Sequence, residues 1–472
     1  MLLVHALQRV LARGKGWHLA ATLAVCVLAA TAMGALVALL KPVYALALVL
    51  GAAGGLLILR DRRLALAAVV AVICLLPFAS VPLNVGFSPT FLNLVLAAYL
   101  FVWVMRIATR AQTPRLATPL AAVVAIYILM TLASFVAGLG HASLNATALR
   151  KFAEIPLGTA VFFAVLDNLR DRQDLEQVTV WLIIGGAVSA GIGIALYVIP
   201  RDLATRLLSA LGTLRYPSGP DVLRFIEDNP SLPMRAISTQ VDPNVLGALL
   251  VLTIGLTAPH LFAPRPPLAR HWLALCVAVS GVCLILTFSR GSFAGLAAGL
   301  LLLSLAPGYR RLWLLMLGAG ALILLLPQTR SYVTHFLEGL QAQDLATQMR
   351  LGEYKDAFIL IQRYPWLGVG FIDAPDIDIY LGVSSLYLLI AEQMGIAGMV
   401  VFVLTQAVYL GTLIRAWRAD QVRGGALSPW LLGPAVAVLG GLVGGIVDHT
   451  LASFPHALTL FWLIVGLGAA TA

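Results

Sequence analysis

Long apolar runs, separated by short polar connections, fill most of the chain. A membrane-spanning helix needs about 20 mostly apolar residues, and about fourteen stretches meet that requirement. These stretches lie at 17–40, 43–59, 64–80, 90–105, 116–138, 148–166, 177–199, 241–262, 271–288, 292–306, 311–326, 385–413, 430–447 and 455–471. The pattern predicts an all-α, polytopic integral membrane protein with about 12–14 transmembrane helices. The two short runs around Ser289-Arg290-Gly291 could instead form one broken hairpin.

The composition agrees with this pattern and narrows the class of protein. Of the 472 residues, 60% are hydrophobic and 11% are charged, whereas a soluble domain has about 25% charged residues. The net charge of +10 does not indicate a nucleic-acid partner, because the arginines occur in short clusters between apolar runs. The four cysteines lie inside apolar runs without metal-ligand spacing. We therefore predict neither a metal nor another cofactor.

The basic clusters predict which side of the membrane each connection faces. The positive-inside rule places clusters of Arg and Lys in the cytoplasm. Such clusters mark the N-terminus and alternate connections, at Arg60/Arg62/Arg63, Arg106/Arg110/Arg115, Arg170/Arg172, Arg265/Arg270, Arg310/Arg311 and Arg415/Arg418/Arg423. The first run is too long for a signal-peptide core, so we expect an uncleaved first span. Both termini are then cytoplasmic, and two long connections, at about 200–240 and 327–384, lie outside.

Both long connections keep positive charges that topology does not explain. These residues are Arg201, Arg206, Arg215, Arg224 and Arg235 in the first, and Arg330, Arg350, Lys355 and Arg363 in the second. One interpretation is a solvated surface on which they pair with carboxylates. The other is an anion-binding site on the outer face. In the second connection, apolar residues at three- and four-residue spacing predict a helix on the membrane surface, ended by Pro365.

Four polar motifs stand where a predicted span meets the outer surface. Arg150 and Lys151 begin the sixth span, where they can anchor it to lipid headgroups. Asp242-Pro243-Asn244 can cap the span that follows, and Arg235 lies shortly before it. In Ser289-Arg290-Gly291 the glycine permits a break in the helix, and a guanidinium beside a helix N-terminus suits a phosphate. The fourth motif, Ser384-Ser385-Leu386-Tyr387, precedes two glycines, Gly395 and Gly398, that allow close helix packing.

These motifs, in this order, resemble the O-antigen ligase and Wzy-type polymerase superfamily of bacterial membrane enzymes. The matching features are Arg235 with Asp242-Pro243-Asn244, Ser289-Arg290-Gly291, Arg350 and Glu353 with the turn Pro365–Gly370, and Ser385 separated by nine residues from Gly395, which Gly398 follows. The family has a histidine where this chain has Ser384. The resemblance covers roughly residues 145–470. It divides the chain into N-terminal transmembrane helices, 1–144, and a ligase- or polymerase-like region with periplasmic loops, 145–472.

The resemblance implies a GT-C-like, inverting, metal-independent glycosyltransferase in the bacterial inner membrane, with its active site facing the periplasm. The donor would be a glycan on undecaprenyl pyrophosphate, and a sugar hydroxyl of a glycan or lipid-linked acceptor would attack its anomeric carbon. The absent histidine favours a polymerase of O-antigen or exopolysaccharide over a ligase acting on lipid A-core. A flippase and a chain-length regulator are candidate partners. The alternative class is a lipid-glycan flippase or other transporter, which would carry ionisable groups near the midplane.

The resemblance also implies roles for particular residues. Arg235, Arg290 and Arg350 would stabilise the charge of the pyrophosphate leaving group, and Glu353 and Ser384 complete the expected catalytic set. The residues expected to bind substrate are Arg150, Lys151, Asn244, Ser289, Ser385, Tyr387 and His335. Candidate proton acceptors are Glu353, His335, Asp373, Asp376 and Asp378. We do not interpret Asp376-Ile-Asp378 as a metal motif.

Overall fold

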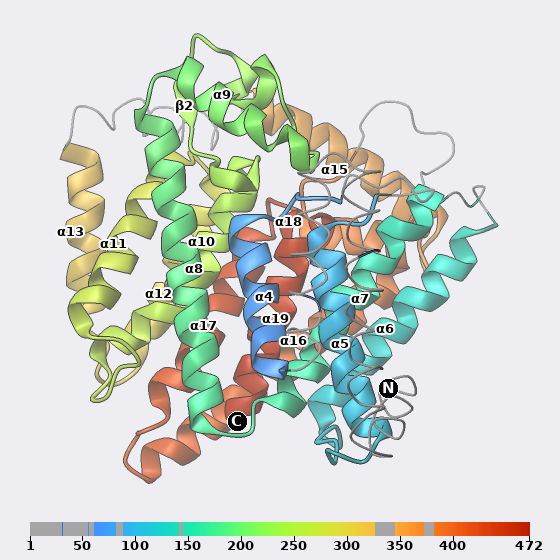
Figure 1. Ribbon diagram of the computed structural model, residues 1–472, viewed down its shortest axis with the longest axis vertical. Coiled ribbons are helices and arrows are strands. Elements are labelled where there is room, and N and C mark those ends of the chain that lie inside the picture. The colour runs from blue at the N-terminus through green and yellow to red at the C-terminus, as the bar shows by residue number, and fades with distance from the viewer. Residues whose placement is uncertain are drawn as a thin grey trace. The chain divides into compact units, whose positions relative to one another are not determined.

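Helices make up most of the part of the chain that the structure describes. The computed structural model describes residues 31, 55, 61–81, 88–140, 144, 146–325, 345–371 and 382–472. Its helices (Figure 1) are α4 (Arg62–Leu75), α5 (Phe91–Ala108), α6 (Pro119–Gly138), α7 (Ala146–Asn168), α8 (Arg172–Val198), α9 (Arg201–Ala210), α10 (Pro243–Thr257), α11 (Arg270–Leu286), α12 (Arg290–Leu305), α13 (Leu312–Leu325), α15 (Leu345–Arg363), α16 (Leu386–Val422), α17 (Ser428–Gly444), α18 (Thr450–Ser453) and α19 (Pro455–Thr471). Two strands of two residues each form the only sheet among these residues. This confirms the predicted all-α class.

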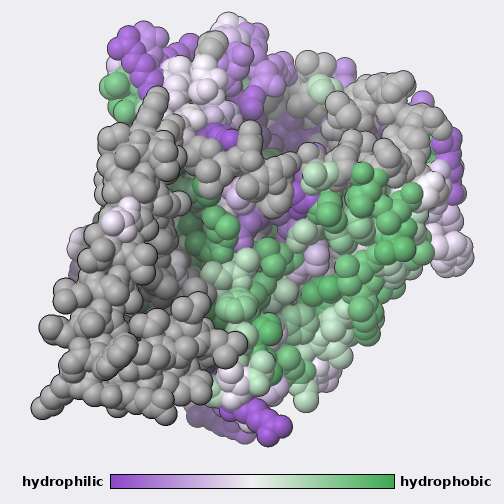
Figure 2. Space-filling model, turned by 45° about the vertical axis from the view of Figure 1, so that its right-hand side comes forward, coloured by the Kyte–Doolittle hydropathy of each residue, from purple (hydrophilic) through white to green (hydrophobic). Residues whose placement is uncertain are grey.

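The lengths and surfaces of these helices confirm a multi-pass membrane protein. Five apolar segments in the described chain are long enough to span a membrane, namely α5, α6, α8, α16 and Pro243–Phe262, which is α10 with its short continuation. Leu129 and Val136 on α6 are 63% and 65% exposed. Figure 2 shows a broad apolar face of this kind. Lipid can cover such a face, whereas water could not do so without a large free-energy cost. The total number of spans and their sidedness stay predictions.

The described residues from Arg62 to Ala472 form one compact unit, which excludes the segment before Arg62. In this unit α10 packs against α17, α12 and α8, and α19 packs against α7 and α17. Trp462 on α19 and Leu250 on α10 are almost completely buried. The contact between α12 and α17 requires glycine, because a Cβ on Gly295 would lie 2.3 Å from the carbonyl oxygen of Gly440. The domain boundary expected near residue 144 stays a prediction.

The first long connection folds into a small cap between α8 and α10. After α9, strand β1 (Arg224–Phe225) pairs antiparallel with β2 (Met234–Arg235), so that Arg224 lies opposite Arg235. The cap and the end of α8 share an apolar core that includes Leu196, Leu208, Val222, Met234 and Ile237. The backbone N–H of Ala236 donates a 2.7 Å hydrogen bond to the carbonyl oxygen of Leu286, the last residue of α11. The cap therefore holds Arg235 beside the connection between α11 and α12.

The second long connection contains the helix that its periodicity predicts. This helix, α15, ends at Arg363, two residues before Pro365. It packs against α16, and its side chains Leu351 and Phe358 are each 54% exposed. Arg350 and Glu353 lie on this helix, whereas His335, Asp373, Asp376 and Asp378 lie outside the described residues.

Candidate active site

Three arginines from separate parts of the sequence line one cleft. Arg235 comes from the cap, Arg290 begins α12 and Arg350 lies on α15. Ile226, Glu227, Asn244 and Phe288 complete the lining, and the cleft encloses about 400 Å³ of empty space including its open mouth. The lining therefore contains three guanidinium groups and one carboxylate, that of Glu227. This excess of positive charge suits a polyanion.

Two hydrogen bonds hold the side chain of Arg235. Its Nε atom donates to the carbonyl oxygen of Thr287 at 2.8 Å, and its Nη2 atom donates to Oδ1 of Asn244 at 2.9 Å. Burial lowers the pKa of its guanidinium to about 10, an effect that the Asp242 carboxylate opposes and the nearby Arg350 increases. Arg235 is therefore still charged at neutral pH, and its side chain joins the end of α11 to the start of α10.

The start of α10 forms as its sequence predicts. Oδ1 of Asp242 accepts hydrogen bonds from the backbone N–H groups of Asn244 and Val245, at 2.7 and 3.1 Å, and Pro243 occupies the first turn. Asp242 is therefore the N-cap residue of α10, as predicted. The helix places the side-chain amide of Asn244 in the cleft, and its positive N-terminal end lies at the same place.

The Ser-Arg-Gly motif forms a tight connection between two separate helices. The chain turns at Phe288, whose φ is 52°, and α12 starts at Arg290. Oγ of Ser289 lies 2.9 Å from Oγ of Ser292, and Arg290 reaches α15 by donating from Nη2 to Oγ1 of Thr347 at 3.4 Å. The helix break was predicted at Gly291, and this position is wrong by three residues because the turn lies at Phe288. Gly291 is helical and packs closely against the end of α17 and the residues after it, since an added Cβ would lie 3.4 Å from the carbonyl oxygen of Gly444 and 3.0 Å from Cγ2 of Val447.

Helix α15 holds the residue that replaces the family histidine. The carboxylate of Glu353 accepts a 2.8 Å hydrogen bond from the backbone N–H of Ser384, and the hydroxyl of Tyr354 donates to the carbonyl oxygen of Ser384 at 3.0 Å. Both backbone groups of Ser384 are thus fixed from α15. Because α15 also carries Arg350, the position of Ser384 is linked to the wall of the cleft.

The turn Pro365–Gly370 docks onto α16 at Gly395. Helix α16 is interrupted at Gly395, whose φ is 70°. Two backbone hydrogen bonds join the turn Pro365–Gly370 to α16 at this point. The N–H of Val369 donates to the carbonyl oxygen of Glu392 at 2.9 Å, and the N–H of Ile396 donates to the carbonyl oxygen of Pro365 at 2.7 Å. A Cβ on Gly395 would lie 2.3 Å from the backbone of Trp366. This docking fixes where α15 ends, and hence where Arg350 lies.

The structure places several expected substrate-binding residues away from the lining of the cleft. Ser385 is buried at the start of α16, and the hydroxyl of Tyr387 donates to the carbonyl oxygen of Leu442 at 2.9 Å. Arg150 pairs with Glu154 at 3.1 Å, four residues along α7, and Lys151 is exposed on the same helix. Ser289 is buried beside the cleft without lining it. Of the expected substrate-binding residues that the structure describes, Asn244 alone lines the cleft.

Asp448 is a residue that the sequence reading missed. It lines a second cavity together with Asn244, Ser292 and Thr450, so Asn244 borders both cavities. Its Oδ1 atom accepts hydrogen bonds from the N–H and the hydroxyl of Thr450. Asp448 is the only acidic residue after Asp420 in an otherwise apolar stretch. It lies in the short connection between the predicted spans 430–447 and 455–471, at the predicted outer surface like the other candidate residues, so its isolation was an available signal.

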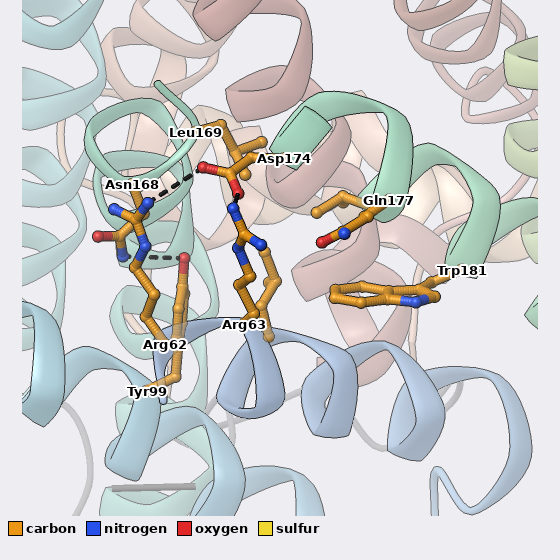
Figure 3. Close-up of a pocket in the computed structure, with 10 residues that line it drawn as sticks. Arg62, Arg63, Tyr99, Asn168, Leu169, Asp174, Gln177 and Trp181 are labelled. Atoms are coloured by element: carbon orange, nitrogen blue, oxygen red, sulfur yellow. Dashed lines mark hydrogen bonds and ion pairs between the residues drawn. The ribbon is translucent and has the colours of Figure 1, made fainter. Parts of the chain in front are cut away.

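A different set of arginines pairs with buried carboxylates at the other end of α8. Asp174, in the first turn of α8, contacts Arg62 at 3.1 Å and Arg63 at 2.7 Å (Figure 3). Asp167 pairs with Arg170 at 2.9 Å. Helix α8 has 27 residues, which corresponds to a length of about 40 Å, and its C-terminal end packs in the core of the cap. These three arginines and the arginine cleft thus lie toward opposite ends of this helix.

Comparison with known proteins supports the resemblance drawn from the motifs. Residues 275–403 match the family model Wzy_C, described as O-antigen ligase. The match includes Arg290, Arg350, Glu353, Ser384 and the turn Pro365–Gly370 with Gly395. A search of the curated proteins found no match to the chain. The part of the chain that holds the Ser-Arg-Gly motif, α15 and the start of α16 is therefore similar to the O-antigen ligase family, which supports the superfamily that the motifs indicated.

Proposed function

We propose that the protein transfers a glycan from undecaprenyl pyrophosphate to a sugar hydroxyl on the periplasmic side of the inner membrane. The observation that carries the proposal is the cleft in which Arg235, Arg290 and Arg350 meet beside Asn244. Helices α10 and α12 both begin here, so their positive ends add to the field of the guanidinium groups. A pyrophosphate is the part of the donor that such a site would bind.

The same cleft would stabilise the transition state. The acceptor oxygen bonds to the anomeric carbon while the bond between that carbon and the pyrophosphate oxygen breaks, with inversion at that carbon. The electron pair leaves on the pyrophosphate, so negative charge grows there. Fixed donors aimed at such charge contribute about 3–4 kcal/mol each, or roughly 100- to 1000-fold in rate. The two hydrogen bonds that hold Arg235 keep it in place before the reaction begins.

Ser384 favours a polymerase over a ligase in this proposal. A serine hydroxyl does not accept a proton readily near neutral pH, so it cannot replace an imidazole as a base. The backbone of Ser384 is held by Glu353 and Tyr354, which leaves a positioning role for this residue. A ligase acting on lipid A-core would use the same donor and the same cleft and differ in its acceptor.

The distribution of charge supports the proposed orientation. The Asp174 and Asp167 clusters lie at the end of α8 away from the cap, and they contain arginines from two of the clusters that the positive-inside rule places in the cytoplasm. The arginines of the cleft lie toward the other end. With this orientation the cleft faces the periplasm, where lipid-linked glycans and their acceptors would meet it.

The test is a reaction with purified protein in detergent, with EDTA present because we propose a metal-independent transfer. A lipid-linked repeat unit serves as donor and acceptor, and lipid A-core is offered in a parallel reaction. Longer glycans on the lipid would support a polymerase, and glycan on lipid A-core a ligase. A transporter would show no turnover, since detergent offers no second compartment. Absence of both products would overturn the proposed transferase.

A further inference from the structure

The proposed transfer requires a group that removes the proton of the attacking hydroxyl. Three other carboxylates near the cleft differ in their availability. Asp242 caps α10, and Glu353 accepts a hydrogen bond from Ser384. Glu227 lines the cleft on the cap, where it is exposed. Two of these three carboxylates therefore already have a structural task, and the third lies at the rim.

Asp448 lies in a different position, between the starts of two helices. It shares the second cavity with Asn244 of α10 and Ser292 of α12. Its Oδ1 atom is held by the two hydrogen bonds from Thr450, while its Oδ2 atom receives no hydrogen bond from the residues that the structure describes. Thr450 thus fixes the carboxylate and leaves one oxygen for a ligand.

The surroundings of Asp448 suit a sugar hydroxyl next to the leaving group. Gly440, Gly441, Gly444 and Gly445 line the same cavity, and glycine permits close approach to the backbone. Asn244 lines both this cavity and the arginine cleft, and it contacts Arg235. A donor with its pyrophosphate at the arginines would therefore present its anomeric carbon near Asn244, with Asp448 on the other side.

We propose that Asp448 accepts the proton of the attacking hydroxyl, an assignment that rests on the proposed function. The proton passes from the acceptor oxygen to Oδ2 of Asp448 as that oxygen bonds to the anomeric carbon. The carbon–oxygen bond to pyrophosphate breaks in the same step, and the electron pair leaves on the pyrophosphate. Asp448 would thereby supply the function for which Ser384 is unsuited.

Azide tests this role because it attacks as an anion and has no proton to lose. Asp448→Asn keeps an oxygen that can accept the hydrogen bonds of Thr450. With the lipid-linked donor, this variant is expected to transfer glycan to a sugar acceptor at least about 100-fold more slowly than the wild type. With azide it is expected to form the glycosyl azide of inverted configuration at a rate close to that of the wild type. A thermal unfolding curve like that of the wild type checks its fold.

His449→Gln is the matched control, one residue away. The His449 ring stacks on Phe454 and its Nδ1 lies 2.8 Å from Oγ of Ser453, and it lines neither cavity. This variant is expected to retain the wild-type rate. The assignment of Asp448 is overturned if Asp448→Asn transfers sugar at the normal rate, or if a folded Asp448→Asn protein loses the azide reaction as well. It is also overturned if transfer is lost in His449→Gln or in Glu227→Gln alone. A wild-type protein that forms neither product overturns the proposed function itself.

Discussion

The Nη2 atom of Arg235 donates a hydrogen bond of 2.9 Å to Oδ1 of Asn244. The two residues come from different elements, β2 of the cap and the first turn of α10. The bond fixes a guanidinium that is mostly buried and also bonded to Thr287. The geometry of the cleft thus depends on a contact between the cap and a buried helix.

Asn244→Ala should weaken transfer without abolishing it. The change removes one acceptor from Arg235 but leaves its charge and its bond to Thr287. A hydrogen bond to a charged group contributes about 1.5–3 kcal/mol, so we expect a loss of roughly 10- to 100-fold in turnover. Steady-state transfer from the lipid-linked donor measures it. A loss as large as that of Arg235→Ala would show that Asn244 does more than hold the arginine.

Glu353→Gln and Glu353→Ala should differ. If the carboxylate serves to hold Ser384, Gln keeps an acceptor oxygen for the Ser384 N–H, and transfer should fall only a few-fold. Ala leaves that partly buried N–H without its partner, which costs about 1–3 kcal/mol. We therefore expect Ala, and not Gln, to lower the unfolding temperature and the rate. Equal loss of transfer in two equally stable variants would instead identify Glu353 as a proton acceptor.

Gly395→Ala should destabilise the protein strongly. An alanine would have to adopt a φ of 70° and place its Cβ 2.3 Å from the backbone of Trp366. The backbone conformation alone costs about 1–3 kcal/mol, and the clash would undock the turn that ends α15. Gly411→Ala on the same helix is the control, because an added Cβ there meets nothing within 4 Å. Thermal unfolding in nanodiscs should separate the two variants, and similar curves would contradict the docking.

Asp174→Asn should lower stability but leave the chemistry intact. The change removes the carboxylate that Arg62 and Arg63 share, and because both arginines are partly exposed we expect a loss of about 1–3 kcal/mol. Glu176→Gln, in an exposed pair with Arg172, should cost at most about 1 kcal/mol. Transfer per folded molecule should stay at the wild-type level in both. Slower transfer per folded molecule in Asp174→Asn would contradict the claim that the ion pairs of Asp174 and the arginine cleft act independently.

Local sequence features predicted the elements of this fold better than their assembly. The apolar runs identified helices such as α10 and α16, and the N-cap residue Asp242 identified where α10 begins. A capping residue and a hydrophobic run act over one or two turns, so they can be read without tertiary contacts. The same reading put the break of the Ser-Arg-Gly motif at Gly291, whereas Phe288 makes the turn.

The candidate site could be predicted only in part, because it is built from long-range contacts. The resemblance selected Arg235, Arg290 and Arg350, and the structure brings them to one cleft. No local signal shows that the turn Pro365–Gly370 docks at Gly395, which is a contact between two backbones. Asp448 was missed because its importance lies in facing Asn244 and Ser292, not in a motif of its own.

The central claim, that the arginine cleft stabilises a leaving pyrophosphate, is tested most directly by Arg290→Ala. Arg206→Ala is its control, because Arg206 is an exposed arginine of α9 that does not line the cleft. Both proteins are purified in detergent and given the same lipid-linked donor and acceptor, and turnover is measured per folded molecule. We predict a loss of roughly 100- to 1000-fold in Arg290→Ala and an unchanged rate in Arg206→Ala. Undiminished turnover in a folded Arg290→Ala protein would contradict the account.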